Sequence, residues 1–157
     1  SNSDSLLTHL RGDGTAHQVD VSEKRVTKRT ATAEATILLT PLILSQLRSN
    51  NLKKGDVLSV ARIASISAAK ATSSLIPLCH NIPITKAETD FEIIEHPPSV
   101  LIHSTVSTVS RTGVEMEALT AVSLAALTIY DMCKAVSHEM TITDVRLVAK
   151  RGGKRDF

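Results

Sequence analysis

The chain has 157 residues, of which 42% are hydrophobic and 22% charged, a balance typical of one globular domain. Only 2% are aromatic and none is Trp, so the core must be aliphatic, and too few rings exist to stack the bases of a nucleic-acid strand. A formal net charge of +2 argues against a generally polycationic surface. We therefore expect no nucleic-acid partner, and any cationic site must be a local cluster.

The two cysteines, Cys79 and Cys133, lie far apart and form no CxxC pair, which argues against a disulfide scaffold and against structural zinc. The start of the sequence does not resemble a signal peptide. The longest apolar stretch, 118–130, is interrupted by Ser and Thr and is too short to span a bilayer. We expect a cytoplasmic protein with no membrane partner, in which residues 1–14 are disordered and residues 15–157 form a single domain.

Hydropathy patterning predicts seven elements along the chain. In order they are a strand at 30–39, helices at 41–48 and 57–74, strands at 87–93 and 100–110, a helix at 114–137 and a strand at 141–149. The strands alternate apolar with polar residues or are rich in β-branched ones. Thr40 followed by Pro41 is a typical helix start, as is Asp56, and Pro77 ends the second helix.

The order of these elements predicts the fold. Without the short first helix it reads β-α-β-β-α-β, the pattern of a ferredoxin-like sandwich. The helix at 114–137 carries apolar residues in steps of three and four, which form one continuous stripe. We therefore predict an α+β fold, an antiparallel four-stranded sheet with helices on one face. Because the other face needs cover, we expect an oligomer formed by copies of the chain.

Asp131, Lys134 and His138 are spaced by three and four residues, so they should share one face of the last predicted helix. Exposed ion pairs of this kind are common and contribute about 0.2–0.5 kcal/mol. The alternative is a partly buried pair that transfers protons, because the flanking residues are apolar. The residues alone leave both interpretations open.

The loop that follows the second helix contains adjacent Cys79 and His80. They could be a nucleophile and its base, half of a metal site, or part of a buried loop. Neighbouring side chains rarely point the same way, and the remaining Cys and His residues lack the spacing of a four-ligand zinc site. A contact from His80 to a phosphate or a base edge remains open.

Three other segments contain charged residues beside glycines or helix starts. Lys53 and Lys54 precede a capped helix, where phosphates bind well, although the GxxxxGK[ST] pattern of a P-loop is absent. The Gly-rich basic tail, 150–155, is either flexible or a phosphate contact. Glu115 and Glu117 suit the positive end of a helix, and they could equally accept hydrogen bonds from a guanine-like edge.

The same segments contain motifs that follow one another in the order of a known family. They are HQVDVS at 17–22, KGD at 54–56, ARIA at 61–64, AAK at 68–70, LIPLCH at 75–80, TGVEMEALT at 112–120 and AALTIYDMCKAV at 125–136. The chain thereby resembles the molybdenum cofactor biosynthesis protein C family, the cyclic pyranopterin monophosphate synthases. The likeness covers about residues 15–154, nearly the whole chain.

The resemblance implies a phosphorus–oxygen lyase that converts 3′,8-cyclo-7,8-dihydroguanosine 5′-triphosphate to cyclic pyranopterin monophosphate and releases pyrophosphate. It also implies a homohexamer, a trimer of dimers, with active sites at subunit interfaces, so that the single domain at 15–157 is catalytic. No cofactor and no protein-bound metal is implied, although Mg²⁺ could accompany the triphosphate.

The resemblance also assigns site residues. Asp131 matches the acid/base position, and Lys54 and Lys134 match essential lysines. The positions expected to bind substrate are His17, Lys70, Leu78, Cys79, His80, Arg111, Glu115, Met116, Glu117 and Lys150.

Two rival classes use the same residues: a regulatory nucleotide-binding oligomer whose lysines only grip phosphate, and a scaffold in which Asp131 and Lys134 form an interface salt bridge. Convergence of Lys54, His80, Asp131 and Lys134 on one pocket, within a chain or across chains, would favour the enzyme.

Overall fold

The computed structural model describes residues 15–50, 52 and 55–157. Its elements are β1 (Thr27–Leu38), α1 (Pro41–Ser49), α2 (Val57–Leu75), β2 (Lys86–Ile94), β3 (Ser99–Ser110), α3 (Glu115–Cys133) and β4 (Thr141–Arg151). The seven predicted elements are confirmed in order and in type. The predictions for residues 1–14, Lys53 and Lys54 lie outside the described residues.

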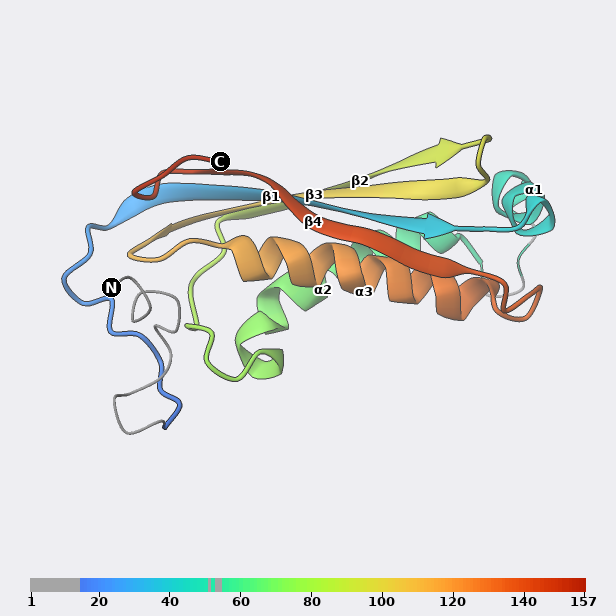
Figure 1. The fold of residues 1–157 in the computed structure, drawn as a ribbon. Coiled ribbons are helices and arrows are strands. Elements are labelled where there is room, and N and C mark those ends of the chain that lie inside the picture. Colours follow the sequence, from blue (N-terminus) through green and yellow to red (C-terminus); the bar gives the residue numbers. More distant parts are fainter. Residues whose placement is uncertain (1–14, 51, 53–54) are drawn as a thin grey trace, which may run out of the picture.

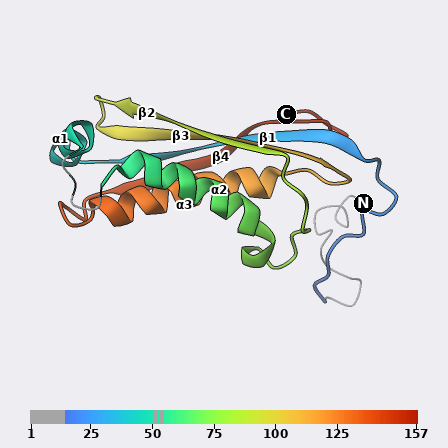
Figure 2. The ribbon, with the colours of Figure 1, turned by 180° about the vertical axis from the view of Figure 1, so that it is seen from behind.

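The four strands form one antiparallel sheet in the order β2-β3-β1-β4. β1 pairs with β3 along its whole length, from Thr27 opposite Ser110 to Leu38 opposite Ser99. The connections from β1 to β2 and from β3 to β4 carry helices, whereas a short turn joins β2 to β3. α2 and α3 cover the same face of the sheet (Figures 1 and 2). The predicted α+β ferredoxin-like sandwich is therefore confirmed.

The core lies between the sheet and α3 and is aliphatic, as the composition predicts. On β1 the residues that face the helices are Ala31, Ala33, Ala35 and Ile37, all buried. Their small side chains let α3 approach the centre of the sheet closely, and α3 packs against β1, β3 and β4 as well as α2. α2 contributes small buried residues to this packing, namely Ala61, Ser65, Ala68 and Ala69.

Side-chain caps begin α1 and α2 where the sequence predicts. The Thr40 hydroxyl accepts a hydrogen bond from the Ile43 backbone N–H at 3.1 Å, and the Asp56 carboxylate accepts one from the Ser59 N–H at 3.2 Å. Each cap satisfies a backbone donor that the first helical turn leaves unpaired. Hydrogen bonds from Ser59 also lower the pKa of the Asp56 carboxyl.

The predicted end of the last helix is wrong, because α3 stops at Cys133 instead of residue 137. The Val136 N–H bonds to the Cys133 carbonyl at 3.0 Å, three residues back, so the helix tightens into a turn. His138 therefore does not share a helix face with Asp131 and Lys134. Its carbonyl instead accepts a hydrogen bond from the Tyr130 hydroxyl at 3.3 Å.

By length and composition alone, α3 could cross a membrane. The sequence had predicted that its apolar stretch is too short to do so. The core helix of a soluble protein meets the same criteria. The apolar side chains of α3 that are buried between the sheet and α2 include Ala118, Val122, Ala125 and Ile129. Its composition is therefore that of a core helix in this fold.

The uncovered face of the sheet is polar. Cross-strand hydroxyl pairs join Thr32 to Thr105 at 2.9 Å and Thr30 to Ser107 at 3.4 Å. Such paired hydroxyls satisfy one another and give the face little drive to exclude water on its own. Burial of this face by another copy stays a prediction.

The basic tail returns to the sheet. Lys150 and Phe157 exchange two backbone hydrogen bonds, at 2.8 and 2.9 Å, and the Thr27 hydroxyl donates to the Gly152 carbonyl at 2.8 Å. Gly152 has a φ of +90°, and a Cβ there would overlap the carbonyl oxygen of Lys28. Only glycine fits this close approach of two backbones.

We predict that Gly152→Ala lowers the free energy of unfolding by about 1–3 kcal/mol, because it adds both a strained φ and a backbone overlap. Urea unfolding measures this loss. The matched control is Gly153→Ala, whose Cβ would meet a side-chain atom of Arg29 at 3.1 Å and no backbone atom within 4 Å. Equal stability of the two variants would show that the close approach at Gly152 does not occur.

Candidate active site

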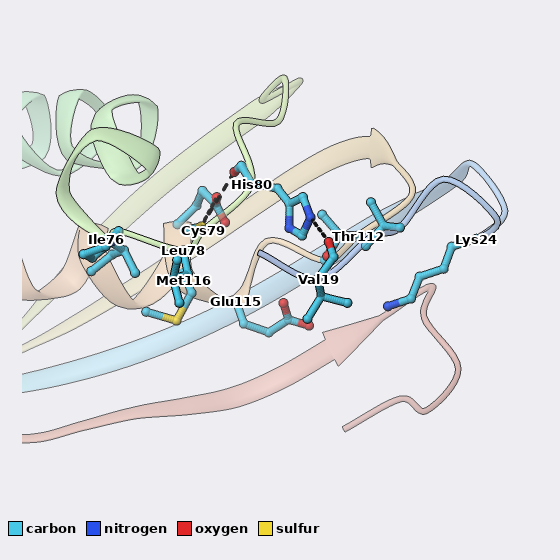
Figure 3. A pocket seen from close by; sticks show the side chains of 13 residues that line it. Val19, Lys24, Ile76, Leu78, Cys79, His80, Thr112, Glu115 and Met116 are labelled. Carbon is cyan, nitrogen blue, oxygen red and sulfur yellow. Dashed lines mark hydrogen bonds between the residues drawn. The ribbon is translucent and has the colours of Figure 1, made fainter. Parts of the chain in front are cut away.

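A cavity of about 630 Å³ opens where the loop after α2 meets the first turn of α3. Its wall comes from three segments: residues within 19–24, the loop 76–80 and the β3–α3 junction 112–117. Figure 3 shows these side chains gathered from segments that lie far apart in the sequence. The predicted contact residues that line it are Leu78, Cys79, His80, Glu115, Met116 and Glu117.

A turn positions the loop between α2 and this cavity. The Ile76 N–H donates to the Thr72 carbonyl at 2.9 Å, and the Cys79 N–H donates to the Ile76 carbonyl at 3.2 Å. The next side chain, His80, reaches the Val19 carbonyl through Nε2 at 2.6 Å. Because a carbonyl only accepts, Nε2 carries the proton. His80 thus attaches the N-terminal segment to the loop and closes one side of the cavity (Figure 3).

Cys79 and Glu117 meet at the cavity wall, with Cys79 Sγ 3.7 Å from Glu117 Oε1. Glu117 is only 3% exposed. Burial raises the pKa of the Glu117 carboxyl, while hydrogen bonds from its own backbone N–H and from Cys79 oppose this effect. Burial also raises the pKa of the Cys79 thiol to about 11, and the charge of Glu117 acts in the same direction. At neutral pH Cys79 is therefore a thiol and a hydrogen-bond donor.

Glu115 stands between this cavity and a second hollow. Its Oε1 lies 3.3 Å from the Lys150 Nζ at the end of β4. The carboxylate folds over Gly113, where a Cβ would overlap it. Glycine at this position therefore lets Glu115 lie between the end of β4 and the cavity.

The second hollow is a groove of about 1060 Å³ that shares Lys24, Thr112, Gly113 and Glu115 with the cavity. The cationic residues that line it are Lys24, Arg25, Arg29, Lys150, Lys154 and Arg155. Asp20 and Glu23 also line it, so the groove carries both signs of charge, with cations in excess. The predicted cation Lys150 lies here and not in the cavity.

Three of the groove cations, Lys24, Arg25 and Arg29, were not among the predicted site residues. They belong to the segment before β1 and to the start of β1 itself, and Arg29 is anchored by hydrogen bonds to the carbonyls of Ser110 and Arg25 at 3.1 and 3.2 Å. The cluster of cations at 24–29 is visible in the sequence and could have indicated an anion-binding surface. Its importance depends on the strand register that brings the basic tail beside it.

Asp131 and Lys134 lie at the other end of α3. Asp131 is sixteen positions after Glu115, which is about 24 Å along a helix that rises 1.5 Å per residue. Lys134 Nζ is 2.8 Å from Asp131 Oδ1, and the two side chains are 47% and 56% exposed, respectively. The hydrogen bond to Asp131 raises the pKa of Lys134.

The expected partial burial of this pair is thus wrong for the single chain, and its role in proton transfer stays a prediction. The next residues, Met132 and Cys133, turn into the core, and the helical rotation carries Asp131 and Lys134 to the surface. The pair and His80 do not converge on one pocket within one chain.

The other predicted residues lie outside the cavity wall. Lys70 is exposed on α2, and Arg111 is exposed in the turn after β3. His17 is half-buried in the segment that leads to Val19. Lys54 lies outside the described residues. Among residues 15–50, 52 and 55–157, no three His, Cys, Asp or Glu side chains gather as metal ligands.

A family model described as the MoaC family matches residues 18–153, which is nearly the whole chain. The chain belongs to the MoaC family. It is also 53% identical over 153 residues to a Drosophila melanogaster protein named molybdenum cofactor biosynthesis protein 1. The match covers 98% of this chain but 27% of that protein, so this MoaC-family chain spans about a quarter of the relative's length.

We predict that Glu117→Gln raises the melting temperature at pH 7.5. Burial raises the pKa of Glu117 in the folded MoaC-family domain, so the stability associated with its protonated form is present at low pH and is lost as the pH rises through the folded value. A neutral amide avoids that loss. The difference between variant and wild type should close near pH 4, as melting curves across pH would show.

The matched control is Glu115→Gln, which removes the charge paired with Lys150 at a side chain only partly buried. It should leave the melting temperature unchanged or lower it slightly. A lower melting temperature for Glu117→Gln than for wild type at pH 7.5 would contradict the prediction.

Proposed function

We propose that the chain is a cyclic pyranopterin monophosphate synthase that acts in molybdenum cofactor biosynthesis. Membership of the MoaC family and the name of the Drosophila relative support this activity. The observation that carries the proposal is the continuity of two hollows, a cavity walled by Glu115 and Glu117 and a groove lined by cations. A purine-derived ring fits the first, and a triphosphate fits the second.

The two hollows suit the two ends of 3′,8-cyclo-7,8-dihydroguanosine 5′-triphosphate. The ring system presents an amino group and a ring N–H, which carboxylates accept. The triphosphate is strongly anionic, and fixed cations stabilise the charge that develops as pyrophosphate leaves. In this proposal Lys24, Arg29 and Lys150 hold the phosphates, and the reaction is that of a phosphorus–oxygen lyase.

The proposed proton-transfer residues must come from another copy of the chain. Asp131 and Lys134 lie about 24 Å along α3 from Glu115, too far to act on the same small molecule within one chain. α2 begins at the end of the molecule where α3 finishes (Figures 1 and 2). Lys54, three residues before α2, is proposed as a catalytic partner of this pair. A homohexamer built as a trimer of dimers, with active sites at interfaces, would bring the Asp131–Lys134 pair of one copy to the cavity of another.

Asp131 and Lys134 have complementary roles in this proposal. The raised pKa of Lys134 makes its ammonium a weaker acid, which suits it to stabilising phosphate charge more than to giving up a proton. Asp131 serves as the acid/base that shuttles protons during imidazole opening and pyrazine closure. The proposal includes a cytoplasmic location and a small-molecule substrate, with no cofactor, no nucleic-acid partner and no membrane partner. Mg²⁺ would enter with the triphosphate.

We predict that the protein converts the cyclic triphosphate to product. Purified protein with the cyclic triphosphate should release pyrophosphate and form a pterin that fluoresces after oxidation, assayed with and without Mg²⁺. Asp131→Asn and Lys134→Ala should keep the fold, by circular dichroism, and lose at least about 100-fold in kcat.

The matched control for these variants is Lys86→Ala, which breaks the exposed Lys86–Glu88 pair at 3.2 Å and should keep turnover. Tight binding without product in the wild type would favour a regulatory nucleotide-binding oligomer. Absence of both binding and product would favour a scaffold. Wild-type turnover by Asp131→Asn or Lys134→Ala would reject their catalytic roles.

A site shared between two copies can be tested by mixing two variants that we expect to be inactive alone. Asp131→Asn and Glu117→Gln damage opposite ends of the chain. If each site takes Asp131 from one copy and Glu117 from another, a mixed dimer contains one intact site. Random co-assembly of equal amounts should then restore about a quarter of wild-type turnover. Co-expression with two affinity tags provides the mixed oligomer, and activity no greater than the average of the parents would exclude sites shared in this way.

A further inference from the structure

We propose that Cys79 is a positioning residue whose thiol donates a hydrogen bond to Glu117 and fixes this buried carboxylate at the cavity wall. The catalytic part of the proposal depends on the proposed function. The contact itself does not, because it is a property of the folded chain.

The contact joins two segments that the packing of α2 against α3 brings together. Cys79 comes from the loop after α2, and Glu117 from the first turn of α3. The Sγ–Oε1 separation of 3.7 Å is within reach of a thiol hydrogen bond. The His80 carbonyl also lies 3.7 Å from the same Sγ. One thiol proton therefore has two acceptors, and the ionised carboxylate is the stronger of the two.

A neutral donor orients a carboxylate without neutralising it. The two acidic residues of the first turn of α3 differ in this respect, because Glu115 is paired with the ammonium of Lys150 whereas Glu117 receives a hydrogen bond from a thiol. The other titratable groups of the cavity wall are His80 and Lys24. His80 Nε2 is engaged by the Val19 carbonyl. Glu117 therefore keeps its charge for a ligand that brings its own N–H donors.

The proposal also explains why a cysteine in a candidate active site need not be a nucleophile. Burial, together with the charges of Glu117 and Glu115, raises the pKa of the Cys79 thiol to about 11. The thiolate that nucleophilic chemistry requires is scarce at neutral pH. Glu117, whose charge helps to suppress the thiolate, is also an acceptor of the hydrogen bond that the thiol donates.

The first experiment needs no turnover. Iodoacetamide labelling of Cys79 is followed across pH in wild type and Glu117→Gln, with peptide mass spectrometry to separate the two cysteines. Removal of the carboxylate should accelerate labelling of Cys79 at pH 8.5 by about threefold to tenfold, since each unit of thiol pKa changes the thiolate fraction about tenfold. Unchanged labelling would overturn the proposal.

Two controls are built into the chain. Cys133 is fully buried, and burial alone raises its pKa to about 11, so its labelling should not respond to Glu117→Gln. Glu115→Gln should accelerate Cys79 labelling less than Glu117→Gln does, because the charge of Glu115 has the smaller effect on the thiol. An equal response to both substitutions would indicate a general field and reject the specific contact.

The second experiment measures kcat/KM against pH for Cys79→Ala and Cys79→Ser. The alanine variant loses the donor that lowers the pKa of Glu117, so the acid limb should move to higher pH, and activity on the acid limb should fall severalfold more than activity at the pH optimum. Serine keeps a donor on a shorter side chain, so its profile should lie between wild type and alanine. A uniform loss at every pH, or coincident alanine and serine profiles, would mean that Cys79 only fills space. Absence of wild-type turnover would reject the proposed function and leave the labelling result to decide the contact.

Discussion

The close packing of α3 against β1 determines where the candidate residues on α3 lie. It depends on a run of small side chains, Ala31, Ala33 and Ala35, on the helix-facing side of a strand that pairs with neighbours on both edges. Larger residues would lift α3 from the sheet and open voids along its length. Because α3 is held along the sheet, its two ends are fixed at opposite ends of the molecule (Figure 1). The carboxylates of the first turn and the Asp131–Lys134 pair are consequently separated by a rigid spacer.

This separation gives the proposed activity its main structural requirement. A single chain offers a cavity and an adjoining cationic groove at one end, and an exposed Asp131–Lys134 pair at the other. Exposed ion pairs are usually worth little to stability, so a catalytic role for this pair requires another environment. Contact with the cavity of a second copy supplies one, since burial at an interface would strengthen the electrostatic coupling between the two groups. In the proposed oligomer, a second copy would complete the site and would also cover the open face of the sheet.

Much of the fold followed from the sequence, whereas the groove did not. Local signals such as the period of two in β1 and the caps at Thr40 and Asp56 act over a few residues, and they were read correctly. The end of α3 was missed because the apolar pattern continues to Val136 while the backbone already turns. The groove combines Arg25 and Arg29 with a tail more than a hundred residues later, and only the β1–β4 register brings them together. The surface position of Asp131 likewise depends on which helix face meets the sheet.

Glu115 and Glu117 show how one local pattern can serve both stability and ligand binding. Val114, at the start of α3, provides no side-chain hydrogen bond, so the acidic first turn is the feature that complements the exposed N–H groups. The Glu117 carboxylate accepts a hydrogen bond from its own backbone N–H, which is one of the free donors of the first turn. Stability alone would be satisfied by two exposed carboxylates, yet Glu117 is buried against a thiol at a cavity wall. The helix terminus makes a buried charge tolerable there, and in the proposed function the ligand in the cavity would bind that charge.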